Sequence, residues 1–221
     1  MKRPLITYFD VRGRAEVIRL ILEEKEIAYR EKRVAIEEWP AFKPTLLFGQ
    51  LPTFEYESEQ GKIVLNQSHA IYRHLARTLD LYGQTEAEHV RCDIVEEAFV
   101  DAQNNLGGFY WNPQFAEKRT DYEKNDLPAL LNKLQQLLQQ NQQGQGFWVG
   151  TGLTYVDFCA WHFLDYVRPF SQRTLEQFEL LYQFKQRLEM RPRIAAYLAS
   201  PRRPATLTVS MAPFGGTPET S

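Results

Sequence analysis

The sequence predicts two structural parts, an α/β domain over residues 1–79 and an all-helical domain over residues 85–221. Three observations support this division. In the first third of the chain, short apolar or alternating segments are separated by a helical pattern, as in βαβ units. From Thr85 onward, strand patterns disappear and amphipathic helices dominate. The length of 221 residues is sufficient for two hydrophobic cores.

The composition indicates a globular protein with a small ligand. The net charge of −2 and the pI of about 6.1 exclude the basic surface that nucleic acids or anionic membranes require. No apolar run reaches the length of a membrane span and no apolar leader precedes the first strand, so we expect a cytoplasmic protein. Cys92 and Cys159 lie in helical patterns, which predicts buried thiols in a reducing compartment and neither a disulfide nor a metal site.

Residues 5–22, LITYFDVRGRAEVIRLIL, predict a strand, a turn and a helix. Residues 5–9 form the strand, Gly13 breaks it, and the helix begins near Arg14. This order places the Tyr8 hydroxyl beside a helix N-terminus, whose free N–H groups and partial positive charge favour an anion. Two interpretations of Tyr8 stay open: a buried tyrosine that closes the strand, and a hydrogen-bond donor to a ligand.

Residues 27–35 alternate apolar and charged side chains and predict a second strand, parallel to the first if the helix is a crossover. An irregular loop is expected over residues 37–50. Its Trp39 and Lys43 either pack against the loop itself or form a lid with donors for a carboxylate.

Residues 53–56 and 62–65 predict two strands joined by a turn. The Leu51-Pro52 bond before them is either trans, as most X-Pro bonds are, or cis, with the Leu51 backbone turned toward a peptide ligand.

A helix is predicted from residues 66–68 to Leu79. Its first polar residues either cap the helix, or Gln67 and Ser68 donate to a ligand carboxylate at the helix start. His69 and His74 have no partners at metal-ligand spacing, so we expect them to pack or to face solvent.

Four segments, TYFDVRGRAEVIRLIL, WPAFK, FGQLPTF and NQSHAIYRHLAR, together resemble the N-terminal thioredoxin-like domain of cytosolic glutathione transferases. The resemblance is greatest to the pi class, with the alpha, mu and sigma classes as near relatives. It rests on the order and spacing of the motifs over about eighty residues. It implies a βαβαββα domain with a cis Leu51-Pro52 bond, followed by an all-helical domain. It also implies glutathione as co-substrate and no metal.

The resemblance implies a role for each matching residue. Tyr8 is the catalytic residue, whose hydroxyl hydrogen-bonds the glutathione sulfur. The expected glutathione-binding residues are Tyr8, Arg14, Trp39, Lys43, Gln50, Leu51, Pro52, Gln67, Ser68 and Asp101, the last reaching the neighbouring subunit of a homodimer. Phe48 matches an aromatic key that enters that subunit. The expected electrophile pocket comprises Phe9, Val11, Arg12, Tyr110 and Trp111.

Helical patterns continue over residues 88–106, 126–140, 178–188 and 193–198. Gly107-Gly108 departs from the family, and we expect it to loosen or kink the first of these helices, leaving open whether Tyr110 or Trp111 faces the electrophile. Thr154 and Asp157 predict a capping box, which gives Asp157 a structural role. For the tail from Pro201, two alternatives remain: folding over the electrophile pocket and staying mobile.

The function predicted from the sequence is conjugation of the glutathione thiolate to hydrophobic electrophiles, a detoxification reaction. The alternatives are a glutathione-dependent prostaglandin isomerase of the sigma type and a non-catalytic ligand-binding or crystallin-like protein. The retention of Tyr8, Arg14, Gln67, Ser68 and Asp101 argues against the non-catalytic alternative.

Overall fold

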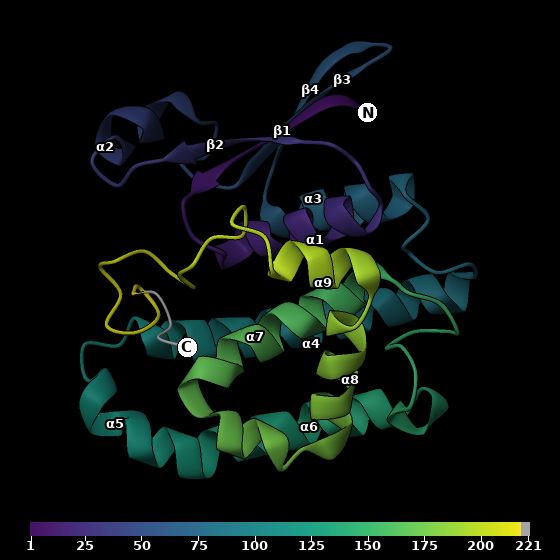
Figure 1. The fold of residues 1–221 in the computed structure, drawn as a ribbon, viewed down its shortest axis with the longest axis vertical. Coiled ribbons are helices and arrows are strands. Elements are labelled where there is room, and N and C mark those ends of the chain that lie inside the picture. Colours follow the sequence, from purple (N-terminus) through teal and green to yellow (C-terminus); the bar gives the residue numbers. More distant parts are fainter. Residues whose placement is uncertain (218–221) are drawn as a thin grey trace.

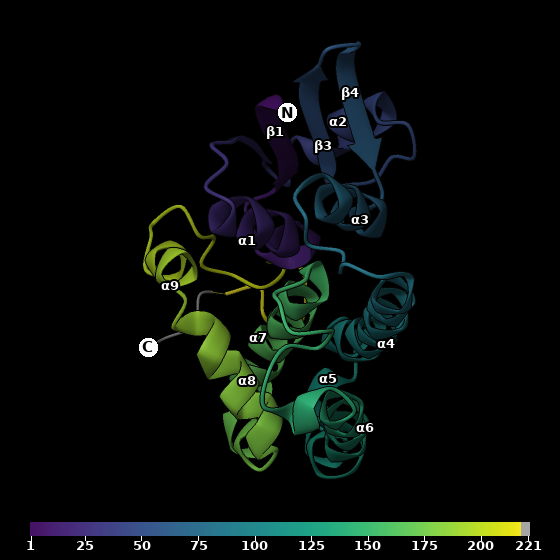
Figure 2. The same cartoon turned by 90° about the vertical axis from the view of Figure 1, so that its right-hand side faces the viewer.

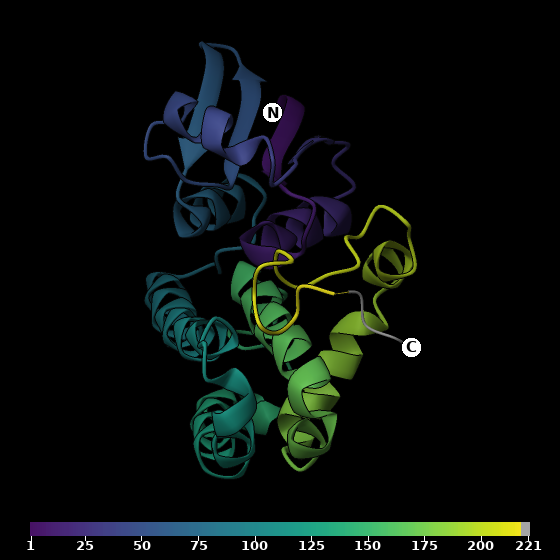
Figure 3. The same ribbon diagram turned by 90° about the vertical axis from the view of Figure 1, so that its left-hand side faces the viewer.

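The computed structural model describes residues 1–217. Figure 1 shows a small sheet with its helices above a set of longer helices, with α7 (Tyr155–Glu176) running through the middle of the helical part. Figures 2 and 3 show α3 (Ser68–Thr78) and α4 (Glu86–Tyr110) along one side of the molecule and α8 (Glu179–Glu189) and α9 (Pro192–Leu198) along the opposite side. The α/β part followed by a helical part is the architecture that the sequence predicts.

The sheet has four strands in the order β2-β1-β3-β4. Their bounds are β1 Lys2–Phe9, β2 Arg30–Val34, β3 Thr53–Ser58 and β4 Gly61–Asn66. β2 pairs with β1 in parallel, as predicted, and β3 and β4 extend the sheet as an antiparallel hairpin.

Two helices cover the sheet and one short helix lies in the connection after β2. A 3₁₀ turn (Gly13–Ala15) leads from β1 into α1 (Glu16–Glu24), whose apolar residues are buried and which contacts α3. α2 (Trp39–Phe42) and a 3₁₀ turn (Lys43–Thr45) occupy the region for which the sequence predicted an irregular loop. Pro40 lies in the first turn of α2, where a helix tolerates proline because those N–H groups have no intrahelical acceptor.

The remaining helices are α4, α5 (Phe115–Asp121), α6 (Leu127–Gln139), α7, α8 and α9, with a π-helical turn at Tyr122–Asp126 and a 3₁₀ turn at Gln142–Gly144. α7 is almost wholly buried and contacts α1, α3, α4, α6 and α8. α5 and the π-helical turn are elements that the sequence analysis did not predict.

The expected kink at Gly107-Gly108 is wrong. α4 continues through both glycines to Tyr110, and the Trp111 N–H still donates to the Gly107 carbonyl at 3.3 Å. The reason is tertiary packing, because Leu106, Phe109 and Tyr110 are buried and hold the helix in place.

The capping box at the start of α7 is confirmed. Asp157 accepts hydrogen bonds from the Thr154 N–H at 2.7 Å and the Trp148 N–H at 3.0 Å. Burial raises the pKa of Asp157 to about 6, against the opposing effect of these hydrogen bonds. Cys92 and Cys159 are buried free thiols. Within residues 1–217, none of the helices has the length and apolarity needed to cross a membrane.

Candidate functional site

Tyr8 lies where β1 ends, beside the turn that begins the first helix. The Arg14 N–H donates to the Tyr8 phenol oxygen at 3.0 Å. Among the described residues, no acceptor takes the phenol proton, so this proton is available to a ligand. Burial raises the pKa of Tyr8 above its usual value of 10, while the Arg14 N–H acts in the opposite direction. The phenol is therefore neutral at pH 7 and can act as a donor.

The carboxyl-terminal tail holds the backbone of this turn. The Arg12 and Gly13 N–H groups donate to the carbonyls of Thr206 and Leu207 at 2.9 and 3.0 Å. The Tyr166 hydroxyl of α7 also donates to the Leu207 carbonyl at 3.0 Å. The tail is thus packed against the loop that follows Tyr8 at Thr206 and Leu207. Residues 218–221 of the predicted tail lie outside the described residues.

Phe214 fixes the tail farther along. Its ring contacts the rings of Tyr110, Phe115 and Phe170 with centroid separations of 4.7, 5.0 and 6.0 Å. The Arg119 guanidinium lies over the Phe214 ring at 5.4 Å. These contacts fasten residues 204–214 across the face of the helical part that adjoins the first domain (Figure 3).

The second helix start brings two predicted residues together. Gln67 precedes α3 with φ of 66°, and its side-chain amide donates to the Gln50 amide oxygen at 3.2 Å. Ser68 is the first residue of α3 and is buried. The Leu51-Pro52 bond in the adjoining connection is cis, as the resemblance implies.

Trp39 and Lys43 come from α2 and the turn after it. The Trp39 ring is half-buried and packs edge-on against Phe9, with centroids 5.2 Å apart. Phe9 in turn lies 5.8 Å from the Tyr8 ring. Lys43 is exposed, and its aliphatic stem passes beside Gly49.

Three of the residues expected in the electrophile pocket, Tyr110, Arg12 and Val11, are buried in the structure. Tyr110 is fully buried and donates to the Tyr166 carbonyl, because its ring belongs to the aromatic core. Trp111, the next residue, is 47% exposed. Arg12 is 2% exposed and donates to Asp165 at 2.9 Å, so its guanidinium turns toward α7 and away from Tyr8. Val11 is buried beside it.

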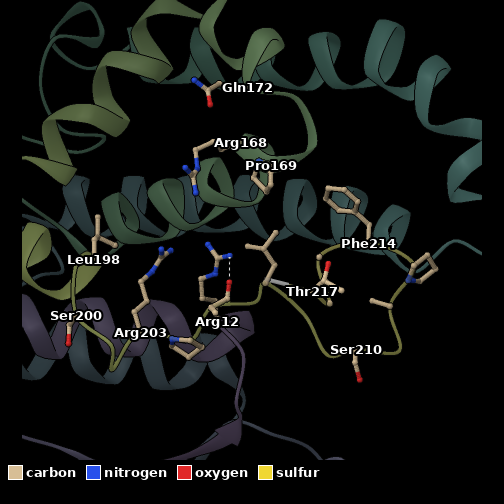
Figure 4. A pocket seen from close by; sticks show the side chains of 17 residues that line it. Arg12, Arg168, Pro169, Gln172, Leu198, Ser200, Arg203, Ser210, Phe214 and Thr217 are labelled. Atoms are coloured by element: carbon tan, nitrogen blue, oxygen red, sulfur yellow. Dashed lines mark hydrogen bonds between the residues drawn. The ribbon is translucent and has the colours of Figure 1, made fainter. Parts of the chain in front are cut away.

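Arg12 lines a cavity of about 950 Å³ between the end of α7, α9 and the tail. In Figure 4 the side chains of Arg12, Arg168 and Arg203 converge on this space, and Arg12 also donates to the Ala205 carbonyl at 3.1 Å. Arg203 donates to Asp165 and to Glu16 at 2.6 and 2.8 Å. Tyr8, Phe9 and Trp111 are not among the lining residues, which sets this cavity apart from the Tyr8 hydroxyl.

Two side chains that the sequence analysis did not single out hold the loop around Tyr8. Asp165 binds Arg12 from α7, and the only sequence signal is an acid in an apolar helix. Tyr72 of α3 donates its hydroxyl to the Arg14 carbonyl. Its signal is the spacing of four residues from Ser68, which places both side chains on one face of the helix.

Asp101 and Phe48 lie on the surface of the single chain. Asp101 is exposed on α4, and Phe48 is 57% exposed in the connection between α2 and β3. His69 contacts Glu96 at 3.0 Å and His74 contacts the Tyr56 hydroxyl at 2.9 Å, so both histidines pack as expected. In the part of the chain that the structure describes, no group of three or more His, Cys, Asp or Glu residues is arranged to hold a metal ion.

Comparison with known proteins assigns the N-terminal and the C-terminal part of the chain to the same protein family. Residues 4–77 match the model of the glutathione S-transferase N-terminal domain, and residues 100–201 match that of the C-terminal domain. Glutathione S-transferase P of Capra hircus is 36% identical over 198 residues, covering 89% of this chain and 91% of the relative.

Solved structures with a similar fold include those of two glutathione S-transferases. The pi-class glutathione S-transferase of Onchocerca volvulus matches with a TM-score of 0.86 at 29% identity, over 95% of this chain and 99% of that chain. The sigma-class enzyme of Fasciola hepatica matches with a TM-score of 0.82 at 27% identity, over 89% and 95% of the two chains.

Proposed function

This chain belongs to the glutathione S-transferase family and is a glutathione transferase; from this we propose that it conjugates the thiolate of glutathione to hydrophobic electrophiles, with Tyr8 as the catalytic residue. The observation that carries the proposal is the Tyr8 hydroxyl. Its oxygen accepts a hydrogen bond from the Arg14 N–H, which leaves the phenol proton available to a ligand. The hydroxyl lies beside the 3₁₀ turn that leads into α1.

The energy needed for thiolate formation is close to what this group can supply. A free thiol has a pKa near 8.5, so lowering it by about 2 units requires about 2.7 kcal/mol. A hydrogen bond to a charged group contributes about 1.5–3 kcal/mol. The partial charge at the start of the first helix adds about 0.3–1 kcal/mol. In the reaction the thiol proton leaves to solvent, the sulfur forms a bond to the electrophilic carbon, and the leaving group departs with its electron pair.

The other glutathione contacts come from the three segments that adjoin Tyr8. The Gln67 and Ser68 donors at the start of α3 bind the γ-glutamyl carboxylate. The Leu51 backbone, before Pro52, pairs with the cysteinyl portion in the manner of an added strand.

Charged and polar side chains complete the proposed glutathione site. The Trp39 indole N–H and the Lys43 ammonium group bind the glycine carboxylate, with Gln50 nearby. Arg14 supports the γ-glutamyl end, where its exposed side chain is accessible to a ligand.

In this proposal the electrophile contacts Phe9, which packs against Tyr8, together with Val11 and Trp111. Phe9 and Trp111 retain solvent-accessible ring surface, which suits a hydrophobic second substrate. Tyr110 lies beneath this surface as core and shapes it only through packing.

The active unit is a cytoplasmic homodimer with a role in detoxification. Exposed apolar side chains support the dimer, since a monomer that leaves such residues in water gains stability by covering them. Five of the exposed apolar side chains are proposed to lie in the interface, Leu47, Phe48, Val64, Val90 and Ile94, each at least 48% exposed. In the dimer Phe48 enters the partner subunit, and Asp101 reaches the γ-glutamyl amine of the glutathione bound there.

Thiolate titration tests the proposal directly. Glutathione is added to the protein, and the ultraviolet absorbance of the thiolate is followed against pH. We expect the pKa of the bound thiol to lie about 2 units below 8.5 in the parent protein and to return toward 8.5 in Tyr8→Phe. A thiol pKa that is the same in both proteins would remove Tyr8 from the catalytic role.

A further inference from the structure

Tyr72 connects the proposed γ-glutamyl site to the catalytic tyrosine. Its hydroxyl is buried under the turn between β1 and α1 and donates to the Arg14 carbonyl. The N–H of the same Arg14 donates to the Tyr8 phenol oxygen at 3.0 Å. One residue of the turn is therefore held from two sides, by a tyrosine of α3 and by the tyrosine of β1.

Ser68 lies at the other end of this chain of contacts. It precedes Tyr72 by four residues, so both side chains share one face of the first turns of α3, and the Ser68 side chain interacts with the Tyr72 hydroxyl. Tyr72 is also close enough to Tyr8 for the two phenols to act on each other electrostatically. Burial raises the pKa of Tyr72 well above its usual value, which keeps the hydroxyl protonated and able to donate.

The packing around Tyr72 leaves its ring little freedom. The side chain is 3% exposed, and the His69 ring packs edge-on against it with centroids 5.2 Å apart. His69 is itself held by Glu96 of α4 at 3.0 Å. The Tyr72 ring is thus held by His69 of α3, which is itself fixed by α4, close to the start of α3, where the γ-glutamyl carboxylate is proposed to bind.

We propose that Tyr72 is a positioning residue, which fixes the Arg14 peptide so that its N–H orients the Tyr8 hydroxyl toward the glutathione sulfur, and which couples that orientation to occupancy of the Ser68 site. The inference rests on the proposed role of Tyr8. It assigns Tyr72 no contact with substrate, and its effect passes through the Arg14 backbone.

The test is Tyr72→Phe, which removes the hydroxyl and keeps the ring. Without the tether, the Arg14 N–H and the Tyr8 hydroxyl sample more orientations, and the thiolate loses part of its hydrogen bond. We expect the pKa of bound glutathione to rise by roughly 0.5–1 unit and conjugation at pH 6 to fall roughly threefold to tenfold. At pH 8.5, where the bound thiol is ionised in both proteins, the rates should differ less than twofold.

Tyr56→Phe is the matched control. Its hydroxyl also bonds to a side chain of α3, His74, at 2.9 Å, but neither of these residues contacts Arg14. Both variants lose one tyrosine hydroxyl from the same domain, so thermal unfolding should place them at similar stability, while only Tyr72→Phe should shift the thiol titration. Equal losses of rate at pH 6 and pH 8.5 in Tyr72→Phe, with no shift of the thiol pKa, would mean a purely structural role and would overturn the proposal.

A double variant, Tyr8→Phe with Tyr72→Phe, tests whether Tyr72 acts through Tyr8. If Tyr72 acts through Tyr8, adding Tyr72→Phe to Tyr8→Phe leaves the thiol pKa where Tyr8→Phe alone puts it. If the two substitutions shift the pKa of the bound thiol additively, Tyr72 does not act through Tyr8. If Tyr8→Phe alone moves nothing, the proposed function fails together with the inference, whereas a shift in Tyr8→Phe without one in Tyr72→Phe rejects the inference alone. Where Tyr72→Phe does not fold, Tyr72→Leu is measured against the same outcomes, with affinity for S-methylglutathione as the check that the site is intact.

Discussion

A Cβ atom at Gly13 would lie 2.5 Å from the phenol oxygen of Tyr8. Gly13 also has a φ of 39°, a conformation that residues with side chains rarely adopt. The backbone of the turn therefore approaches the Tyr8 hydroxyl as closely as only glycine permits. This approach also places the Arg14 N–H within hydrogen-bond distance of the phenol oxygen.

Gly13→Ala should accordingly displace the Tyr8 ring or the turn and reduce conjugation at least roughly tenfold, since misplacement of a reacting group by about 1 Å can cost about a hundredfold. The measurement is the initial rate with saturating glutathione. Gly108→Ala is the control, because its Cβ would meet no atom within 4 Å. That variant should keep the parent rate and gain about 0.5–1 kcal/mol of stability, as alanine replaces glycine inside a helix. Equal rates for Gly13→Ala and the parent would contradict the geometry.

Trp111 and Tyr110 should separate into a substrate contact and a core residue. Trp111→Ala should raise the KM for a hydrophobic electrophile several-fold and leave thermal stability nearly unchanged, since the ring is 47% exposed. Tyr110→Phe removes the hydrogen bond to the Tyr166 carbonyl and should cost about 1–3 kcal/mol of unfolding free energy, because that carbonyl is left without its partner. If Tyr110→Phe raised the KM and Trp111→Ala lowered the stability, Tyr110 would be the residue that contacts the electrophile.

Phe48→Ser should weaken the dimer. The aromatic side chain is 57% exposed in the single chain, and its burial in a partner would contribute about 1.5–3 kcal/mol per site. Sedimentation velocity over a range of concentrations measures the shift toward monomer. Met190→Ser removes an apolar side chain that is 71% exposed from the C-terminal end of α8, a helix that Figure 2 shows on the side of the molecule opposite α2 and β3, and should leave the dimer intact. An unchanged sedimentation profile for Phe48→Ser would count against the insertion of Phe48 into the partner subunit.

Acid should destabilise the protein through His162. Burial lowers the pKa of this histidine from 6.5 to about 4 in the folded state, against the opposing effect of the Glu16 and Asp165 carboxylates and with a smaller contribution from Arg12 and Arg203. Between these two pH values the unfolded chain binds the proton and the folded chain does not, so stability falls as the pH drops from about 6.5 toward 4. The loss from this residue should be about 2 kcal/mol at pH 5.

His162→Phe isolates this effect, because other groups titrate in the same range and contribute equally to both proteins. Urea unfolding at pH 7 and pH 5 gives the stability change of each. The parent should lose about 2 kcal/mol more than the variant between these pH values. If the two lose the same amount, the folded-state pKa of His162 is not depressed.

The elements that position the site were predictable from local patterns. The strand and helix around Tyr8, the parallel second strand and the hairpin follow from periodicity and from turn residues, and each is present. The motifs that resemble the family predict that Gln50 and Gln67 both bind glutathione, and in the structure their side chains are hydrogen-bonded to each other.

What could not be predicted depends on tertiary packing. Gly107-Gly108 reads locally as a break, yet buried neighbours keep α4 helical. The resemblance predicts that Arg12 lies in the electrophile pocket. In the structure the Arg12 guanidinium is buried, because it donates to Asp165, 153 residues later in the chain. Local sequence also gave no sign that the Thr206 and Leu207 carbonyls hold the turn after Tyr8. Each of these is a contact between segments far apart in sequence, which spacing within one segment cannot reveal.

The most direct test of the account is the rate at which glutathione is conjugated to an aryl halide by the parent protein and by Tyr8→Phe. Removal of the hydroxyl should lower the rate about 10²–10³-fold, as removal of a single oxyanion-hole donor does, while the affinity for S-methylglutathione stays within a few-fold of the parent value. Equal rates in the two proteins would contradict the central role of Tyr8 and move the search for the thiolate's partner to Arg14.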